Sequence, residues 1–173
     1  MSNGTLTLAQ AKEEFISRWG TLGSNWGINR AMSQIHALLL LSPEPLSTDE
    51  VMAGLHISRG SANTNLRDLI NWGLIMKVNR KGERRDYFEA EKDVWRIFCT
   101  IARERKRREI DPTVKVLQQC AQAAKGVRSA EAKAVYEQIR ALEEFVSLAA
   151  SVMDKVASST DSKVVPTILK VLK

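Results

Sequence analysis

The chain has 173 residues, 44% of them apolar, and its 26 basic and 20 acidic side chains give a net charge of +6. That length suffices for one domain with a real core, or for a small domain plus an assembly element. The longest uninterrupted apolar run covers only residues 37–41, which is far too short to cross a bilayer, so we expect no membrane association.

Two features of the sequence bear on the compartment. The first ten residues, MSNGTLTLAQ, lack the basic and apolar regions of a secretory signal. The two cysteines, Cys99 and Cys120, are far apart and form no CxxC pair. We therefore expect a cytoplasmic protein with reduced thiols.

The positive charge is unevenly distributed. Residues 1–57 have a net charge of −2, whereas residues 58–89 carry seven basic and four acidic side chains, a net charge of +3. A basic segment can bind nucleic acid, an anionic membrane or an acidic partner, and charge alone does not choose between them.

Two helices are predicted at the start of the chain. Thr7 and Gln10 have the spacing of a capping box, and apolar residues then recur at helical spacing on one face: Leu8, Ala11, Phe15, Trp19 and Leu22. A second helix is predicted over residues 29–41, ending before the prolines of residues 42–45.

The next elements predict a winged helix-turn-helix. A capping box at Ser47–Glu50 opens a short helix that ends near Gly54, and Ser58 caps a further helix that ends at Gly73. Residues 74–78 and 85–89 are then expected to form a hairpin of two strands around a polar tip with a turn-forming glycine. A short hairpin is marginal in water, so it must pack on the neighbouring helices.

The remainder of the chain is predicted to be helical. Val94, Phe98 and Ile101 mark one helix, the pair Asp111-Pro112 signals a restart, and Ser129 caps a long last helix over residues 130–157. That helix has a heptad seam: Val135, Ile139, Leu142, Val146, Ala149, Met153 and Val156. A short apolar segment at 164–172 is expected to form a final helix.

The predicted fold is thus mainly α with a small β-hairpin wing, a winged helix-turn-helix plus a long helical dimerisation region. We expect three parts: residues 1–28, an N-terminal helix that contributes to dimerisation; residues 29–90, the winged helix-turn-helix; and residues 91–173, a C-terminal region for dimerisation and effector binding. The heptad seam is compatible with a dimer coiled coil and with an intramolecular core, and we expect it to contribute to both.

The helix that begins at residue 59 is predicted to read DNA. Its apolar residues Ala62, Leu66 and Leu69 face the core, while the opposite face at its N-terminal end carries short polar groups and cations. Such helices enter the major groove by their N-terminal half, where Arg pairs with guanine and Asn with adenine. The predicted DNA-binding residues are Arg59, Ser61, Asn63, Thr64 and Arg67 on the helix, and Arg80, Lys81 and Arg84 on the wing.

The same residues resemble a known family. Their order and spacing are similar to the MarR-type winged helix regulators, and more closely to the GbsR subgroup, with Asn29 in place of that subgroup's proline. The matching segments are 26–30 (WGINR), 42–47 (SPEPLS), 57–61 (ISRGS), 65–69 (NLRDL), 72–75 (WGLI) and 82–88 (GERRDYF).

The resemblance implies a homodimer whose terminal helices form the interface and whose two recognition helices meet successive major grooves of a near-palindromic operator in double-stranded DNA. It also implies a repressor that controls osmoprotectant genes, with a small-molecule effector such as choline. The seam and the first helix supply the candidate dimerisation residues: Phe15, Trp19, Ile139, Leu142, Val146 and Met153.

The sequence is also compatible with other functions and other sites. A DNA-architectural protein without sequence preference and a protein-interaction adaptor are the alternatives. Trp19, Trp26, Trp95 and Tyr136 could line a cage for a quaternary ammonium, but aromatics at helical spacing more often belong to a core. The basic run at 103–108 could contact phosphate, although such runs are more often solvated helix faces.

The sequence offers nothing for catalysis or metal binding. Cys99, with Arg96 and Arg103 one turn away, could be a redox sensor, but its apolar neighbours favour an inert thiol. His36 and His56 are isolated and have no metal-ligand grouping around them. We predict no enzyme activity, no cofactor and no metal.

Overall fold

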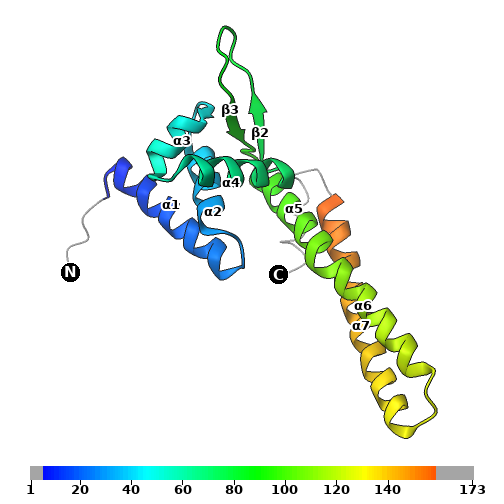
Figure 1. Ribbon diagram of the computed structural model, residues 1–173. Helices are drawn as coiled ribbons and strands as arrows, with labels where there is room; N and C mark the ends of the chain where they lie inside the picture. The colour runs from blue at the N-terminus through cyan, green and yellow to red at the C-terminus, as the bar shows by residue number, and fades with distance from the viewer. Residues whose placement is uncertain (1–5, 159–173) are drawn as a thin grey trace, which may run out of the picture. The chain divides into compact units, whose positions relative to one another are not determined.

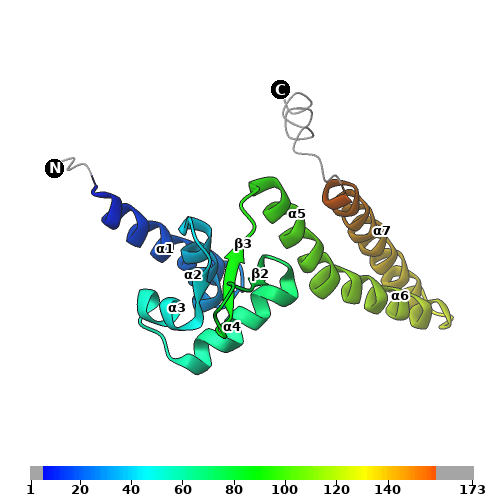
Figure 2. The same ribbon diagram turned by 90° about the horizontal axis from the view of Figure 1, so that it is seen from above.

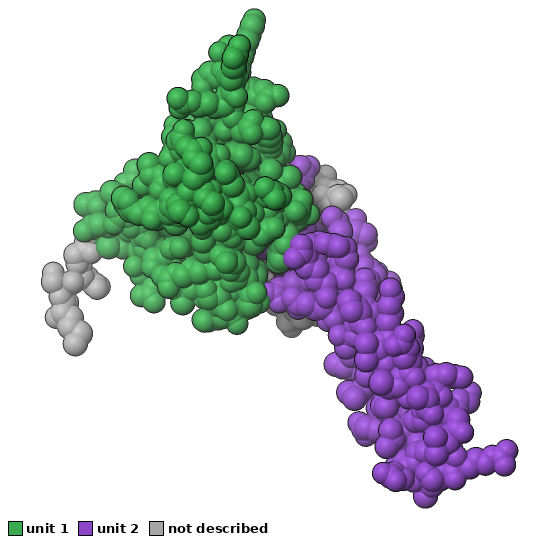
Figure 3. Space-filling view, viewed as in Figure 1, with its two compact units in different colours: residues 1–93 green, residues 94–173 purple. Residues whose placement is uncertain are grey.

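The structure is a computed structural model, and it describes residues 6–158. It divides into two compact units, residues 1–93 and residues 94–173, which Figure 3 shows in different colours. The first helix belongs to the first unit together with the winged helix-turn-helix, whereas residues 1–28 were predicted to form a separate part. The predicted helix at 164–172 lies outside the described residues.

The first two helices have the predicted bounds because their caps are local. α1 (Leu8–Asn25) begins at the Thr7 capping box, and α2 (Arg30–Leu41) begins at Asn29, whose side chain accepts hydrogen bonds from two backbone N–H groups. The two helices cross closely (Figure 1). A methyl carbon at Gly23 would lie 2.0 Å from Ser33 Oγ, so glycine is required where the backbones approach.

The helix-turn-helix is formed by α3 (Thr48–Leu55) and α4 (Arg59–Trp72). α3 begins at the predicted capping box, in which the Ser47 hydroxyl and N–H donate to Glu50 and lower the pKa of its carboxyl. His56 turns the chain in the left-handed conformation at φ 54°, and Gly73 ends α4 at φ 76°. The core under these helices includes Ile35, Leu39, Val51, Leu66 and Leu69, each fully buried.

The wing is a three-stranded antiparallel sheet in the order β1-β3-β2. β2 (Ile75–Val78) and β3 (Tyr87–Ala90) form the predicted hairpin, which rises beyond α4 in Figure 1. The prediction of two strands was incomplete, because β1 (Leu46–Ser47) pairs with β3. This third strand anchors the hairpin to the residue that caps α3, and thereby to the helix-turn-helix.

The second unit is a set of long helices (Figure 2). α5 (Val94–Arg105) continues through a π-helical turn, η1 (Lys106–Ile110), into α6 (Asp111–Lys125). α6 thus begins at Asp111 as predicted, but the chain stays helical across this boundary and Asp111 is not the N-cap that the prediction made it. Pro112 has no N–H to donate within a helix, and the backbone widens just before it, with the Asp111 N–H donating to the carbonyl of Lys106 five residues back.

The predicted apolar stripe of α5 was also wrong in part. Val94 is 76% exposed and Phe98 is 51% exposed, while Ile97 and Cys99 are buried. Phe98 instead stacks on Trp95, with ring centroids 5.4 Å apart.

α7 (Ala130–Ser158) runs beside α6 and begins at Ser129, whose hydroxyl accepts from the N–H of Ala132. Its buried residues Glu143, Ala150 and Ala157 repeat every seven residues. This line is shifted by one residue from Leu142, which the predicted seam contained and which stays exposed. The other seam residues at 139, 146 and 153 are partly covered by the chain itself.

Candidate nucleic-acid interface

The N-terminal half of α4 presents one polar face and buries the other. The Ser58 hydroxyl caps the helix by accepting a hydrogen bond from the Ser61 N–H at 3.3 Å. Ala62, Leu66 and Leu69 lie in the core, as predicted. The predicted reading residues Arg59, Asn63, Thr64 and Arg67 are exposed, and Ser61 is half-buried.

Asn65, which was not among the predicted site residues, fixes the position of Ser61 on α4. It is buried, and its side-chain amide donates to the Ser61 carbonyl at 2.8 Å and to the Ser61 hydroxyl at 3.3 Å. Ser61 is thus already engaged by its own helix. In the sequence, the buried position of Asn65 is indicated by its place next to Leu66 on the core side of the helix. A polar residue is not normally expected there, so its burial was not predicted.

The predicted wing cations fall into two groups. Arg80, just after β2, is held against the segment before β1: its guanidinium lies 3.5 Å from the Glu44 carboxylate, donates to the Pro45 carbonyl at 3.2 Å and stacks over the Tyr87 ring at 4.4 Å. Lys81 and Arg84 are exposed at the tip, and within residues 6–158 neither has an ionic partner. A contact between Arg80 and DNA would have to release these interactions.

Acidic residues accompany several of the cations. Asp49, in the first turn of α3, lies 2.5 Å from Arg59 Nη2 and 4.0 Å from Arg85 Nη1. On the wing, Lys77 pairs with Asp86 at 2.8 Å. Within residues 6–158 a further acidic residue of the wing, Glu83, pairs with no cation but accepts a hydrogen bond from the Tyr87 hydroxyl, and this bond raises the pKa of Tyr87.

The basic run at 103–108 is largely occupied by internal contacts in the second unit. Arg107 and Arg108 both donate to the buried Glu104, and these hydrogen bonds, Arg107 first, lower the pKa of that carboxyl. Lys106 pairs with Asp111 at 2.7 Å and with Asp154 at 3.3 Å. These contacts favour a structural role for the run over phosphate binding.

The alternative sites concern four aromatic residues and one thiol. Trp19 and Trp26 belong to the first unit and Trp95 and Tyr136 to the second, so the aromatic cage stays a prediction. Cys99 is buried, and its Sγ lies 3.6 Å from the Val156 carbonyl, which favours the inert thiol.

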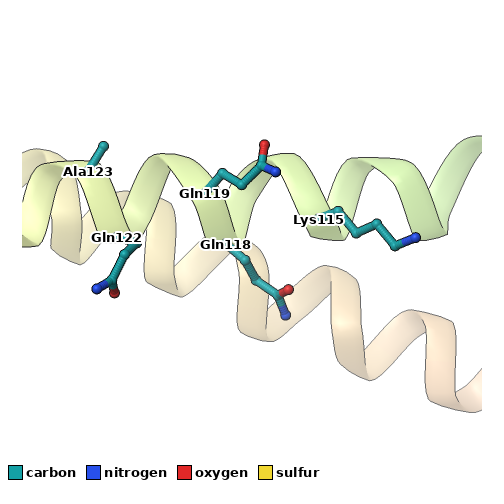
Figure 4. A pocket seen from close by; sticks show the side chains of 5 residues that line it. All are labelled: Lys115, Gln118, Gln119, Gln122 and Ala123. Atoms are coloured by element: carbon teal, nitrogen blue, oxygen red, sulfur yellow. The ribbon is translucent and has the colours of Figure 1, made fainter.

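An open hollow lies on α6, with side chains that are mostly amides (Figure 4). Gln118 points toward α7 in this view and donates to the buried Glu143 at 3.1 Å. The hollow lacks the aromatic faces that bind a quaternary ammonium. Its lining residues are Lys115, Gln118, Gln119, Gln122 and Ala123.

The described residues contain neither a metal-ligand cluster nor a membrane-spanning helix. Within residues 6–158, no three His, Cys, Asp or Glu side chains are grouped as a metal ion would require. None of the helices in that range has both the length and the apolar content of a membrane span.

The first unit has a winged helix-turn-helix fold, in which α4 occupies the place of a recognition helix. Comparison with known proteins agrees with this class. One solved structure, described as a transcriptional regulator, aligns with 84% of this chain and 99% of its own, with a TM-score of 0.55 and 22% sequence identity. At that identity the likeness shows the fold alone.

Three curated relatives are HTH-type transcriptional regulators. The chain is 32% identical over 95 residues to MmpR5 of Mycobacterium tuberculosis (strain ATCC 25618 / H37Rv), covering 54% of this chain and 56% of the relative. It is 24% identical over 102 residues to the putative regulator YvaV of Bacillus subtilis (strain 168), covering 58% of each. It is 23% identical over 112 residues to the repressor GbsR of the same organism, covering 65% of this chain and 62% of the relative.

These matches span about six-tenths of the relatives' own length. No family model matches the chain. The relatives support a DNA-binding transcription regulator, which is the class that the fold and the polar face of α4 also indicate.

Proposed function

We propose that this chain is a sequence-specific transcription regulator of the MarR/GbsR type that binds a near-palindromic operator as a homodimer. The observation that carries the proposal is that α4 has one buried apolar face and one exposed polar face. Its back is fixed in the core by Leu66 and Leu69, and its front presents Arg59, Asn63 and Arg67 to solvent at the end that enters a major groove in this fold.

The exposed wing tip supports the same proposal. Lys81 and Arg84 extend from the β2–β3 hairpin, where cations contact the minor groove or the phosphate backbone in winged domains. Most phosphate contacts position a protein on DNA without reading the sequence. The division of roles would therefore be base readout by α4 and positioning by the wing.

An uncovered apolar face on α7 supports the homodimer. Phe145, Leu148 and Val152 are between 53% and 70% exposed and lie on the side of α7 away from the buried line at Glu143 and Ala150, with the 46% exposed Leu142 at the edge of that face. Apolar faces of this kind mark protein–protein contacts. The proposed interface adds this face to the partly covered Ile139, Val146 and Met153, with Phe15 and Trp19 of α1 as further candidates.

Phe145→Glu tests the dimer. Removing the phenyl groups of both copies, each worth about 1.5–3 kcal/mol when fully buried, is expected to weaken self-association at least about tenfold in sedimentation equilibrium. The control is Val127→Glu, at an apolar residue in the α6–α7 turn that is 59% exposed, against 70% for Phe145. Equal effects of the two substitutions would argue against this face as the interface.

The proposal includes repression of osmoprotectant genes, with an effector such as choline. Both points rest on the family resemblance, and the relative GbsR is named as a repressor. A repressor would compete with polymerase at the operator, and an effector would change the spacing of the two recognition helices.

The decisive experiment is selection of bound fragments from genomic DNA by the full chain, followed by competition with random DNA at matched salt. Enrichment of a near-palindromic motif is the expected result, and the adjacent genes identify the regulated function. Equal affinity for selected and random fragments would instead support an architectural protein, and the absence of measurable binding at moderate salt would support an adaptor.

A further inference from the structure

Asn65 is a buried amide on the core side of α4, one helical turn after Ser61, and its side chain is 5% exposed. Its side-chain nitrogen lies 2.8 Å from the Ser61 carbonyl oxygen and 3.3 Å from the Ser61 hydroxyl oxygen. Ser61 follows the cap residue Ser58 by three positions. Both contacts therefore act on the first turn of α4, at the end that enters a major groove in this fold.

The Ser61 carbonyl fixes the orientation of the Asn65 amide. A carbonyl oxygen can only accept a hydrogen bond, so the amide atom 2.8 Å from it must be the NH2 group and not the amide oxygen. The NH2 group carries two hydrogens, and the second one reaches the Ser61 hydroxyl oxygen. The Ser61 hydroxyl is therefore an acceptor toward Asn65.

This contact leaves the hydrogen of the Ser61 hydroxyl for another partner. A serine hydroxyl has one hydrogen to donate and two lone pairs to accept with, and its hydrogen turns away from a group that donates to its oxygen. Within residues 6–158 this hydrogen has no acceptor. Ser61 is half-buried between the buried Asn65 and the exposed Thr64 on the helix surface, so the hydroxyl lies at the edge of the exposed polar face.

We propose that Ser61 donates a hydrogen bond to an acceptor atom of the operator, and that Asn65 is the positioning residue that holds Ser61 for this contact. The inference rests on the proposed function and adds a residue that does not itself touch DNA. The acceptor is a phosphate oxygen or an atom of a base edge, since serine contacts both. Because Asn65 restrains the hydroxyl in the free chain, less side-chain freedom is lost when DNA binds.

A double-mutant cycle tests the action of Asn65 through Ser61, with the full chain and the selected genomic fragment as the probe. Ser61→Ala removes the donor and is expected to weaken binding about three- to tenfold per hydrogen bond. Asn65→Ala is expected to weaken binding about two- to fivefold, because the hydroxyl remains but is no longer held. In the Ser61→Ala background, where Asn65 can still donate to the carbonyl of residue 61, Asn65→Ala is expected to change the affinity by less than about 1.5-fold.

A stability control separates this role from a general loss of packing. Urea denaturation gives the folded fraction of each variant, and affinities are compared where each variant is folded. Val51→Ala removes buried volume from the core of the same unit but no hydrogen-bond donor, and it is expected to keep the wild-type affinity. Asn65→Leu replaces Asn65→Ala if the smaller side chain prevents folding. An effect of the Asn65 substitution that persists in the Ser61→Ala background, or an equal loss in Val51→Ala, overturns the inference.

Modified fragments identify the acceptor atom. A single methylphosphonate removes the charged oxygen of one phosphate, and a single base-pair substitution changes one base edge. One position should weaken binding by the wild type but not by Ser61→Ala. A methylphosphonate at that position marks a phosphate contact, and a base pair marks base readout. Identical profiles for the wild type and Ser61→Ala overturn the inference.

The outcomes also distinguish this inference from the function on which it rests. A wild-type chain that does not prefer the selected fragment to random DNA refutes both. A wild-type chain with a clear preference, together with an unchanged affinity in Ser61→Ala, refutes only the contact of Ser61 and the role of Asn65.

Discussion

His36 makes the stability of the first unit depend on pH. Its side chain is 3% exposed in α2, beside the Trp19 ring of α1, and its Nε2 has no hydrogen-bond partner among residues 6–158. Burial, and then the nearby Lys92 ammonium, lower the pKa of His36 from 6.5 to about 4. Lys92 is itself fixed there because it donates to the carbonyls of Leu39, Leu40 and Ser42 at the end of α2.

The sign and the size of the effect follow from this shift. Above pH 6.5 the imidazole is neutral in both states, so it adds no pH dependence. As the pH falls below 6.5 the unfolded chain binds the proton first, and the free energy of unfolding decreases until the folded state also binds it near pH 4. The loss is about 2 kcal/mol between pH 7.5 and pH 5, and about 3 kcal/mol in full.

The assay is urea denaturation of the full chain at constant protein concentration from pH 8 to pH 4.5, with His36→Gln as the variant. Gln cannot titrate, so the wild type should lose about 2 kcal/mol more than the variant between pH 7.5 and pH 5. His56→Asn, at an exposed histidine whose left-handed conformation asparagine tolerates, is the control and should retain the wild-type slope. Parallel pH profiles for wild type and His36→Gln would refute the reasoning.

Three further predictions concern the DNA interface. Arg67→Ala should weaken operator binding and relax the preference at one base pair by about 1–3 kcal/mol; an unchanged preference across operator variants would remove Arg67 from the reading set. Lys81→Ala should weaken binding to all sequences alike and make the salt slope shallower by about one unit, and an unaltered slope would exclude a phosphate contact. Gly60→Ala should raise the free energy of unfolding by roughly 0.5 kcal/mol, because the added methyl group meets no described atom within 4 Å, yet weaken DNA binding where α4 approaches the groove; unimpaired binding would contradict that close approach.

The helix starts could be predicted because their caps are local. Thr7, Ser47 and Ser58 each bond the backbone three residues ahead, so the pattern is contained within four letters of sequence. Gly73 could be predicted for the same reason, since a left-handed residue after a helix is strongly enriched in glycine.

Elements that depend on distant partners could not be predicted. β1 has two residues and is a strand only because Phe88 and Tyr87 of β3 lie opposite it. In α5 the spacing of Val94 and Phe98 is as regular as that of the buried residues, and the packing of α5 against α7, through Cys99 and the Val156 carbonyl, selects the other face. Periodicity reveals an amphipathic helix, but not which of two apolar stripes is covered.

The same limit applies to the candidate site. Residue type and position on α4 predicted which side chains would be exposed, but not their partners in the free chain. Asp49 is ten residues from Arg59, and the Pro45 carbonyl is 35 residues from Arg80. Both contacts exist only because the turn after α3 and the third strand bring those segments together.

The cations of the interface differ in how strongly contacts within the free chain restrain them. Lys81 and Arg84 have no ionic partner within residues 6–158, Arg59 is held by one exposed carboxylate, and Arg80 is held by a carboxylate, a carbonyl and a ring. Unrestrained cations attract any phosphate, so they set the affinity for DNA in general. A restrained cation must first leave its internal partners before it can contact DNA, so its net contribution is smaller by the energy of those contacts, and a substitution that removes a partner should raise the affinity for every DNA site that the cation contacts.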